Sequence, residues 1–145
     1  MKSDNLKYKD EILSFSPNLE TFEEREIVSF RYTFDQIEHP DNFLPTYIKD
    51  EKRYKKVLLQ NKAVFIGYGL SLYEDETKAK TKYLSMIGRR STLHKKIGTH
   101  LAKGRVGIEC GISDPCNEES HFTLLENAGI ELVNNFEIET QLYIE

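Results

Sequence analysis

The strongest constraint on how this chain folds is a block of positive charge in its middle. Residues 77–105 contain nine Lys or Arg residues and no carboxylate. Like charges at this density repel one another unless acidic groups lie beside them or an external anion neutralises them. The fold must therefore either cover this block with its own carboxylates or present a basic surface to a partner.

The rest of the charge is divided as sharply. Residues 1–48 carry five basic and ten acidic residues. Residues 49–105 carry fifteen basic and five acidic residues, and residues 106–145 carry nine acidic residues and no Lys or Arg. The zones have net charges of −5, +10 and −9, within a chain of net charge −4. The acidic last third is the internal candidate for neutralising the basic block. It is equally a candidate surface for a basic protein partner, as an inhibitor or immunity-type protein would use it.

Length and composition indicate an ordinary globular domain. The 145 residues correspond to one domain, and 39% are hydrophobic, with eight Tyr and eight Phe to fill a core. The apolar runs fall far short of the ~20 residues that cross a bilayer. The first residues lack the apolar segment of a secretory signal, and two cysteines are too few for a disulfide framework. We expect a cytoplasmic protein without a membrane partner, disordered over residues 1–10 and folded as a single domain over residues 11–145.

Apolar periodicity predicts an α+β fold. Period-two or β-rich runs predict strands over residues 26–33, 64–73, 105–110, 121–126 and 136–144. Ala79, Tyr83, Met86 and Ile87 form the stripe of a helix that starts at residues 74–76. A second helix is expected from a Ser91 cap to about Gly104. The prediction is a mainly antiparallel sheet of about five or six strands with two central helices packed on one face.

In that fold the basic residues lie on exposed helical faces and on the connection between the helices. We expect this surface to bind an anionic partner, such as nucleic acid, a nucleotide phosphate or an acidic protein, through Arg89, Arg90, Lys95, Lys96, Lys103 and Arg105. The cluster at residues 52–56 places an aromatic among four cations, as backbone-binding surfaces do, and adds to it. The chain is thus interpreted as a small binding or regulatory domain.

A phosphate-handling enzyme is the alternative function. His100 and His121 are the best acid–base candidates, because imidazole titrates near neutrality and both lie near basic charge. His121-Phe122-Thr123 resembles the His-x-Thr element of two-histidine phosphoesterases, where two such motifs place two imidazoles around a phosphate. The second copy is missing here, since residues 99–101 read Thr-His-Leu. The resemblance implies phosphoester chemistry at these histidines.

A second resemblance implies nucleotide transfer. Arg31, Ser71 and Glu137-Ile138-Glu139 follow the chain order of the Arg, Ser and Glu-x-Glu elements of arginine-targeting ADP-ribosyltransferases. In that family the Arg holds the dinucleotide phosphates, the Ser orients the nicotinamide ribose, and a Glu stabilises the oxocarbenium-like centre. Ser71 lacks the flanking Ser or Thr of the family's Ser-Thr-Ser element. The resemblance covers these few positions alone.

Metal and cofactor sites are not expected. Cys110 and Cys116 with His121 and either His94 or His100 would supply four zinc ligands, but five residues separate the cysteines. His94 and His100 are six residues apart, which turns them by about 240° on a helix. The common nucleotide-binding and hydrolase fingerprints are missing from the sequence as well.

Overall fold

The computed structural model describes residues 1–144 and confirms the α+β class. Its strands are β1 (Ile27–Thr33), β2 (Leu70–Tyr73), β3 (His100–Val106), β4 (Gly111–Ser113), β5 (His121–Glu126) and β6 (Phe136–Gln141). They form one antiparallel sheet in the order β4-β5-β2-β1-β3-β6. The helices are α1 (Lys9–Leu13), α2 (Thr46–Lys49), α3 (Glu51–Leu59), α4 (Glu76–Arg89) and α5 (His94–Ile97).

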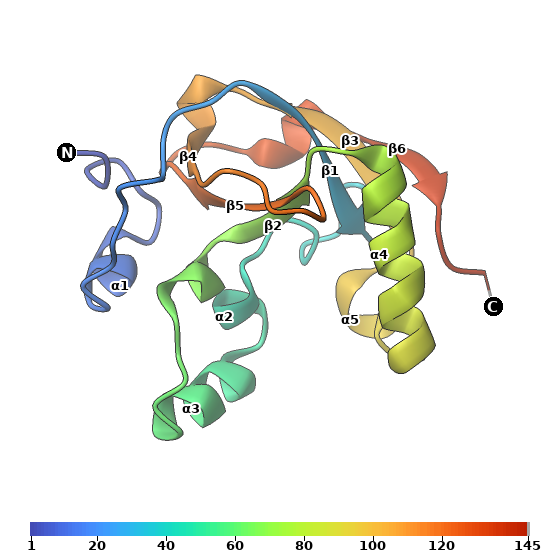
Figure 1. Ribbon diagram of the computed structural model, residues 1–145, viewed down its shortest axis with the longest axis horizontal. Coiled ribbons are helices and arrows are strands. Elements are labelled where there is room, and N and C mark those ends of the chain that lie inside the picture. Colours follow the sequence, from blue (N-terminus) through green and yellow to red (C-terminus); the bar gives the residue numbers. More distant parts are fainter. Residues whose placement is uncertain (145) are drawn as a thin grey trace.

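The helices lie on one side of the sheet, in two groups. Figure 1 shows α1, α2 and α3 below β4, β5 and β2, and α4 with α5 below β1 and β3. The opposite face carries the largest apolar core, to which the central strands and the segment before β6 contribute Leu70, Leu72, Ala102, Val106, Phe122, Leu124, Leu132 and Phe136. The gap between the two helix groups leaves the middle of the helical face, over β2 and β5, without a covering helix.

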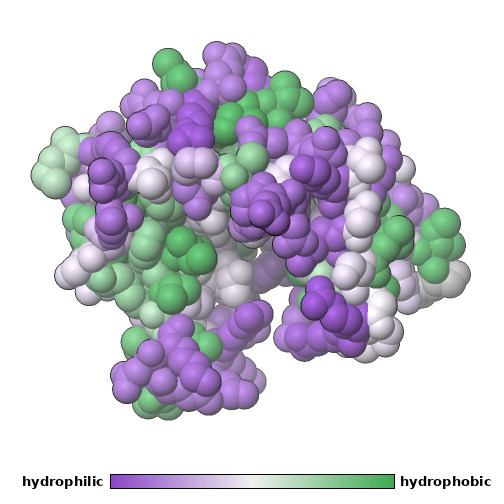
Figure 2. All heavy atoms as spheres, viewed as in Figure 1, coloured by the Kyte–Doolittle hydropathy of each residue, from purple (hydrophilic) through white to green (hydrophobic). Residues whose placement is uncertain are grey.

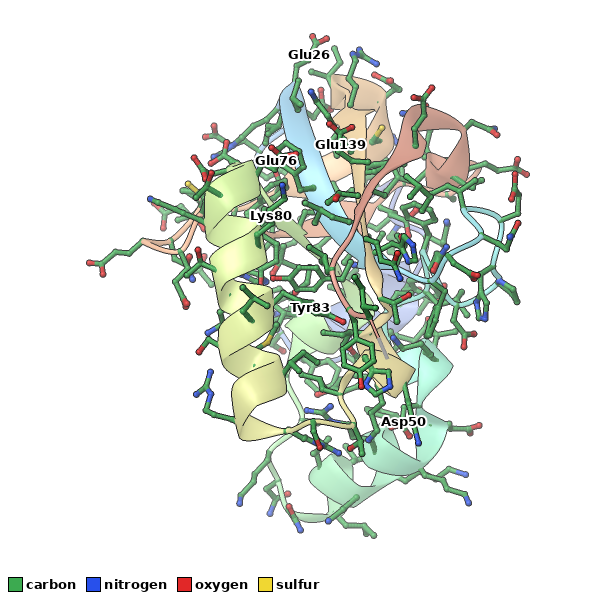
Figure 3. The ribbon with its side chains drawn as sticks, turned by 90° about the vertical axis from the view of Figure 1, so that its right-hand side faces the viewer. Glu26, Asp50, Glu76, Lys80, Tyr83 and Glu139 are labelled. Carbon is green, nitrogen blue, oxygen red and sulfur yellow. The ribbon has the colours of Figure 1, made fainter. Side chains whose placement is uncertain are left out.

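Helix α4 is anchored to the sheet through two tyrosines. The Asp75 side chain caps the helix by accepting a hydrogen bond from the Lys78 amide, 2.8 Å away. Tyr83 is fully buried and points from α4 toward the interior (Figure 3), where its hydroxyl donates to the Gly98 carbonyl at 2.8 Å. Tyr32 of β1 donates to the Ala79 carbonyl at 2.6 Å. These contacts fix the right-hand wall of the gap.

The other helix group surrounds a tyrosine cluster. Tyr47 of α2, Tyr54 of α3 and Tyr68 pack ring against ring, with centroids 4.6–5.8 Å apart. Gly67 lies against the Tyr47 ring, where a Cβ atom would come within 2.2 Å of a ring carbon. Residues Phe65–Tyr68 form a turn of 3₁₀-helix. The strand predicted over residues 64–73 is therefore wrong in its first half, and only Leu70–Tyr73 joins the sheet.

The predicted second helix is also wrong over most of its length. Helix α5 spans only His94–Ile97, and residues 100–106 form β3 instead. Gly98, at φ +102°, ends the helix in a conformation that favours glycine, and its Cα lies against the Thr33 carbonyl. The run from His100 to Val106 then pairs with every residue of β1. Lys103 and Arg105 consequently lie on a strand and not at a helix end.

The N-terminal segment, for which disorder was expected, is in contact with the domain. Leu6 is buried and forms an isolated bridge with Asn127, and α1 starts at Lys9. The Lys7 ammonium lies 3.2 Å from the buried Glu126 carboxylate. The segment is otherwise mostly polar, and its Leu6 side chain packs into the apolar cluster that contains Tyr47 and Tyr68. None of the helices in residues 1–144 combines the length and apolar character needed to cross a bilayer.

Candidate anion-binding cleft

The gap between the helix groups is a cavity of about 450 Å³. Its floor is the uncovered middle of the sheet, with Ser71 and Tyr73 from β2 and His121 and Thr123 from β5. One wall comes from α2, α3 and the segment after α3, and the other from α4 and α5; the basic residues that line it are Arg31, Lys49, Arg53 and Lys62. In Figure 2 the molecule is hollowed between two hydrophilic lobes at this place. We refer to this cavity as the cleft.

Arg31 is the central cation of the cleft. Strands β1 and β2 pair only at Phe30 and Tyr73, and the Arg31 guanidinium spans the opening where they diverge. Its Nε donates to the Asn42 carbonyl at 2.6 Å and one Nη donates to the Ser71 carbonyl at 2.8 Å. The guanidinium carbon also lies 5.8 Å from the centroid of the Phe43 ring. The side chain is thus held rigidly, while the guanidinium still borders the cavity.

The charge of Arg31 has no carboxylate partner among residues 1–144. The side chain is only 8% exposed, yet no Asp or Glu of residues 1–144 lies within 4.0 Å of it. Burial lowers its pKa to about 10, with a small opposing effect from Glu126. A guanidinium with that pKa is still charged at neutral pH. Buried charges are ordinarily paired, whereas the partners of this one are the Asn42 and Ser71 carbonyls.

Lys49 adds positive charge close to Arg31. Burial, and next the charge of Arg31, lower the pKa of the Lys49 ammonium, while Asp41 and Asp50 oppose the shift. Its Nζ donates to the Lys96 carbonyl at 3.1 Å and so reaches across from α2 to α5. Asp41 also lines the cleft and offsets part of this charge. The cleft therefore combines four cations with one carboxylate among the described lining residues.

A serine and a histidine meet on the cleft floor. The Ser71 hydroxyl and His121 Nε2 are 2.5 Å apart, on neighbouring strands. The His121 ring packs against the Tyr73 ring with centroids 5.3 Å apart. Its backbone amide donates to Asn117 Oδ1 at 3.0 Å, and its carbonyl accepts from the Asn117 amide at 2.9 Å. The imidazole is therefore held in place from its ring and from its backbone.

The environment of His121 favours a neutral imidazole. Burial lowers its pKa below the ordinary value of 6.5, and the positive charge of Lys82 acts in the same direction. Asp114 and Glu119 act against the shift. At neutral pH the ring can therefore accept a hydrogen bond at Nε2 when its proton is on Nδ1.

The six residues predicted to bind an anion are divided by the fold. Arg89 and Arg90 lie at the end of α4, and Lys95 and Lys96 lie on α5; all four are exposed, form no ion pair among residues 1–144 and do not line the cleft. Lys103 and Arg105 lie on β3, away from the cleft lining. Lys103 faces the Phe30 ring, and Arg105 is paired with Glu26 and Glu109 at 2.7 and 3.2 Å.

The fold does not bring together all the residues of either the phosphoesterase or the ADP-ribosyltransferase resemblance. His100 lies on β3 and His121 on β5, with β2 and β1 between them, which amounts to roughly 14 Å across the sheet. Arg31 and Ser71 are in contact, but Glu137 and Glu139 lie on the edge strand β6, three strands from Ser71. The two imidazoles thus form no pair, and the Arg–Ser contact lacks the Glu of the transferase pattern.

The cysteines lie apart from the cleft. Cys110 is buried beside Gly107 and Asn135, and Cys116 is exposed in the loop between β4 and β5. Within the described part of the chain no three His, Cys, Asp or Glu side chains gather to hold a metal ion.

Several residues of the cleft carried no signal in the sequence. Lys49, Lys62 and Thr123 are isolated polar residues, and nothing in their spacing connects them to Arg31 or to Ser71. Arg53 was noticed only as part of a basic cluster. Gly67 and Gly69 precede Ser71 and lie close to two other lining residues, since a Cβ on Gly67 would meet the Tyr47 ring and one on Gly69 the Thr123 side chain. Comparisons of the chain with protein-family models, with curated proteins and with solved structures find no match.

Proposed function

We propose that this protein binds the phosphate groups of a nucleotide or nucleic acid in the cleft. The proposal rests on the buried Arg31 guanidinium. This group borders the cavity, and no carboxylate of residues 1–144 forms an ion pair with it. An anion seated beside it would compensate a charge that the chain itself leaves uncompensated. Arg is well suited to this role, since its planar fork matches two oxygens of one phosphate.

The size and surroundings of the cleft support the same ligand class. A cavity of about 450 Å³ lies in the range of small-molecule and cofactor sites. Tyrosine rings at its edge, from Tyr32, Tyr47 and Tyr73, provide apolar surface for a base or sugar. The exposed cations of α3 on one side, and of α4 and α5 on the other, extend the positive field beyond the cavity. Such a field would attract a strand longer than one nucleotide.

Fluorescence anisotropy with a labelled single-stranded oligonucleotide tests the proposal. Arg53→Gln removes a cation of the cleft wall, whereas Lys55→Gln removes one from the same helix that pairs with Glu51 and does not line the cleft. We expect Arg53→Gln to weaken binding about tenfold, the effect of one charged hydrogen bond, and Lys55→Gln to change it less than about twofold. The slope of log K against log salt should also become shallower by about 0.7 in Arg53→Gln.

Competition identifies the source of the phosphate. Displacement of the oligonucleotide by ATP at matched charge indicates a nucleotide pocket, and displacement only by a longer strand indicates a nucleic-acid surface. Displacement by poly-glutamate with no preference for phosphate would overturn the proposal in favour of an acidic protein partner. Equal losses in Arg53→Gln and Lys55→Gln would overturn it as well, because binding would then reflect general charge on α3.

A further inference from the structure

We infer that the floor of the cleft is a phosphodiesterase site, in which Ser71 is the nucleophile and His121 its general base. Two features of the molecule bear on this: the 2.5 Å contact between the Ser71 hydroxyl and His121 Nε2, and its place beneath the cations of the cleft. The inference deepens the proposed function, since it names the chemical class of substrate that the same cleft would take. It also adds a reaction, which binding alone does not require.

The geometry meets the first requirement of nucleophilic catalysis. A serine hydroxyl is a weak nucleophile until an adjacent base takes its proton, and that base must lie within hydrogen-bond distance. Nε2 of His121 lies at such a distance, the Tyr73 ring packs against the imidazole, and Asn117 holds the His121 backbone. Ser71 is an exposed residue on the cleft floor, so a ligand in the cavity can reach its hydroxyl.

The second requirement is a group that stabilises the negative charge of the transition state. Arg31 donates from one Nη to the backbone carbonyl of Ser71, and both residues line the same cavity. Its hydrogen bonds among residues 1–144 use Nε and that Nη, which leaves the second Nη able to donate to a phosphate oxygen. Fixed donors of this kind are among the largest contributions to phosphoryl transfer. Lys49, whose pKa responds to Arg31, adds a second positive charge.

The reaction balances with water as the only co-reactant. The Ser71 oxygen attacks phosphorus while its proton moves to His121 Nε2; the O–P bond to Ser71 forms and the ester bond to the leaving alcohol breaks. The imidazolium then gives its proton to the leaving oxygen. A water molecule next attacks phosphorus, passes a proton to His121 and releases Ser71, which regains its proton. The net change converts a phosphodiester and water into a phosphomonoester and an alcohol.

Labelling with a fluorophosphonate, which phosphonylates activated serines with loss of fluoride, tests the nucleophile. Mass spectrometry of the digested wild type should find one adduct, on Ser71. Ser71→Ala should abolish it, and His121→Gln should slow it by about 100-fold or more. Ser85→Ala, which removes an exposed serine of α4, should leave the rate unchanged. Circular dichroism and oligonucleotide binding by Ser71→Ala show that the variant is folded and that its cleft is intact.

The pH dependence sharpens the same experiment. Labelling needs a neutral imidazole, so its rate should fall in acid with a midpoint below pH 6.5, because burial lowers the pKa of His121. The groups that act on this imidazole are Lys82 of α4, Asp114 and Glu119 of the loops beside β5, and the Ser71 hydroxyl. Lys82→Gln removes one charge that lowers this pKa and should move the midpoint upward.

Turnover of bis(p-nitrophenyl) phosphate tests the substrate class. We expect hydrolysis that is lost in Ser71→Ala and in His121→Gln. Oligonucleotide binding without Ser71 labelling or turnover would overturn this inference and leave the proposed function standing. Labelling and turnover without oligonucleotide binding would support the nucleophile and overturn the nucleic-acid ligand. Hydrolysis of p-nitrophenyl acetate in place of the phosphodiester would overturn the substrate class.

Discussion

Two arginines of neighbouring strands have opposite surroundings. Arg31 of β1 is 8% exposed and has no carboxylate within 4.0 Å among residues 1–144. Arg105 of β3 has a side chain that is 51% exposed, and it contacts two carboxylates, Glu26 and Glu109. Glu26 marks the opposite end of the molecule from Asp50, which lies beside the cleft wall (Figure 3).

The difference shows which basic residues have an internal counter-charge. Two residues of the basic block are paired within the chain: Lys82, in the middle of α4, lies 3.0 Å from Glu119, and Arg105 contacts Glu109 of the acidic last third and Glu26 from before β1. At the cleft no carboxylate of residues 1–144 pairs with Arg31, which is the most deeply buried of the four lining cations. An exposed pair contributes little to stability, whereas a buried charge without a partner is costly. A ligand can therefore gain most at Arg31.

The largest expected effect of this contrast is on thermal stability. A bound oligonucleotide at about 100 times its Kd should stabilise the folded state by about 2.7 kcal/mol, which corresponds to a rise in Tm of roughly 8 °C. Differential scanning fluorimetry measures the shift. In Arg31→Met the shift at the same ligand concentration should fall to about half of this or less, because a Kd raised tenfold leaves about 1.4 kcal/mol of stabilisation. An equal shift in wild type and variant would show that the ligand does not use the buried guanidinium.

A smaller effect is expected on affinity itself. Arg31→Met should weaken oligonucleotide binding by at least about tenfold, because hydrogen bonds to charged groups contribute about 1.5–3 kcal/mol. Arg105→Met should leave the affinity within about twofold. Arg31→Lys keeps the charge without the planar fork and should lie between wild type and Arg31→Met. Circular dichroism of each variant separates loss of binding from loss of fold, and equal affinities for Arg31→Met and Arg105→Met would remove the contrast.

The smallest effect is on the free energy of unfolding at the exposed pair. Arg105→Met should destabilise the protein by less than about 1 kcal/mol in urea, and the difference should shrink as salt is added. Urea titrations at low and high ionic strength measure it. A loss of several kcal/mol that salt does not reduce would mean that Arg105 is a packing residue of the β1–β3 pair.

The sequence predicted the elements whose pattern is local. Tyr83 with its neighbours in the apolar stripe located α4, and the alternation from Phe136 onward located β6. The failure at residues 91–104 has a physical cause, because Leu93, Ile97 and Leu101 have helical spacing but Gly98 interrupts them. Leu101 and Val106 then face opposite sides of β3, and pairing with both β1 and β6 overrides the helical pattern.

The cleft was predictable only in part, for a similar reason. His121, Arg31 and Ser71 were each singled out, but in two different patterns: His121 in the phosphoesterase resemblance, and Arg31 with Ser71 in the ADP-ribosyltransferase resemblance. They come together because β2 pairs with β5 and because β1 diverges from β2. The local periodicity of the sequence predicts neither of these arrangements. The basic block contributes none of the four cations that line the cleft, which are Arg31, Lys49, Arg53 and Lys62. Which of its members stay unpaired depends on how α4, α5 and β3 are placed, as Arg90 and Arg105 illustrate.

The pairing of Ser71 with His121 has a consequence for how the cleft arises during folding. The two residues are 50 positions apart, and each depends on the other strand to reach the floor. Helices α3 and α4 are local structures and can begin to form as soon as their own residues leave the ribosome, whereas β2 waits for β5. A growing chain would thus display its cations before Ser71 and His121 come together, and the proposed chemistry at Ser71 would require the closed sheet.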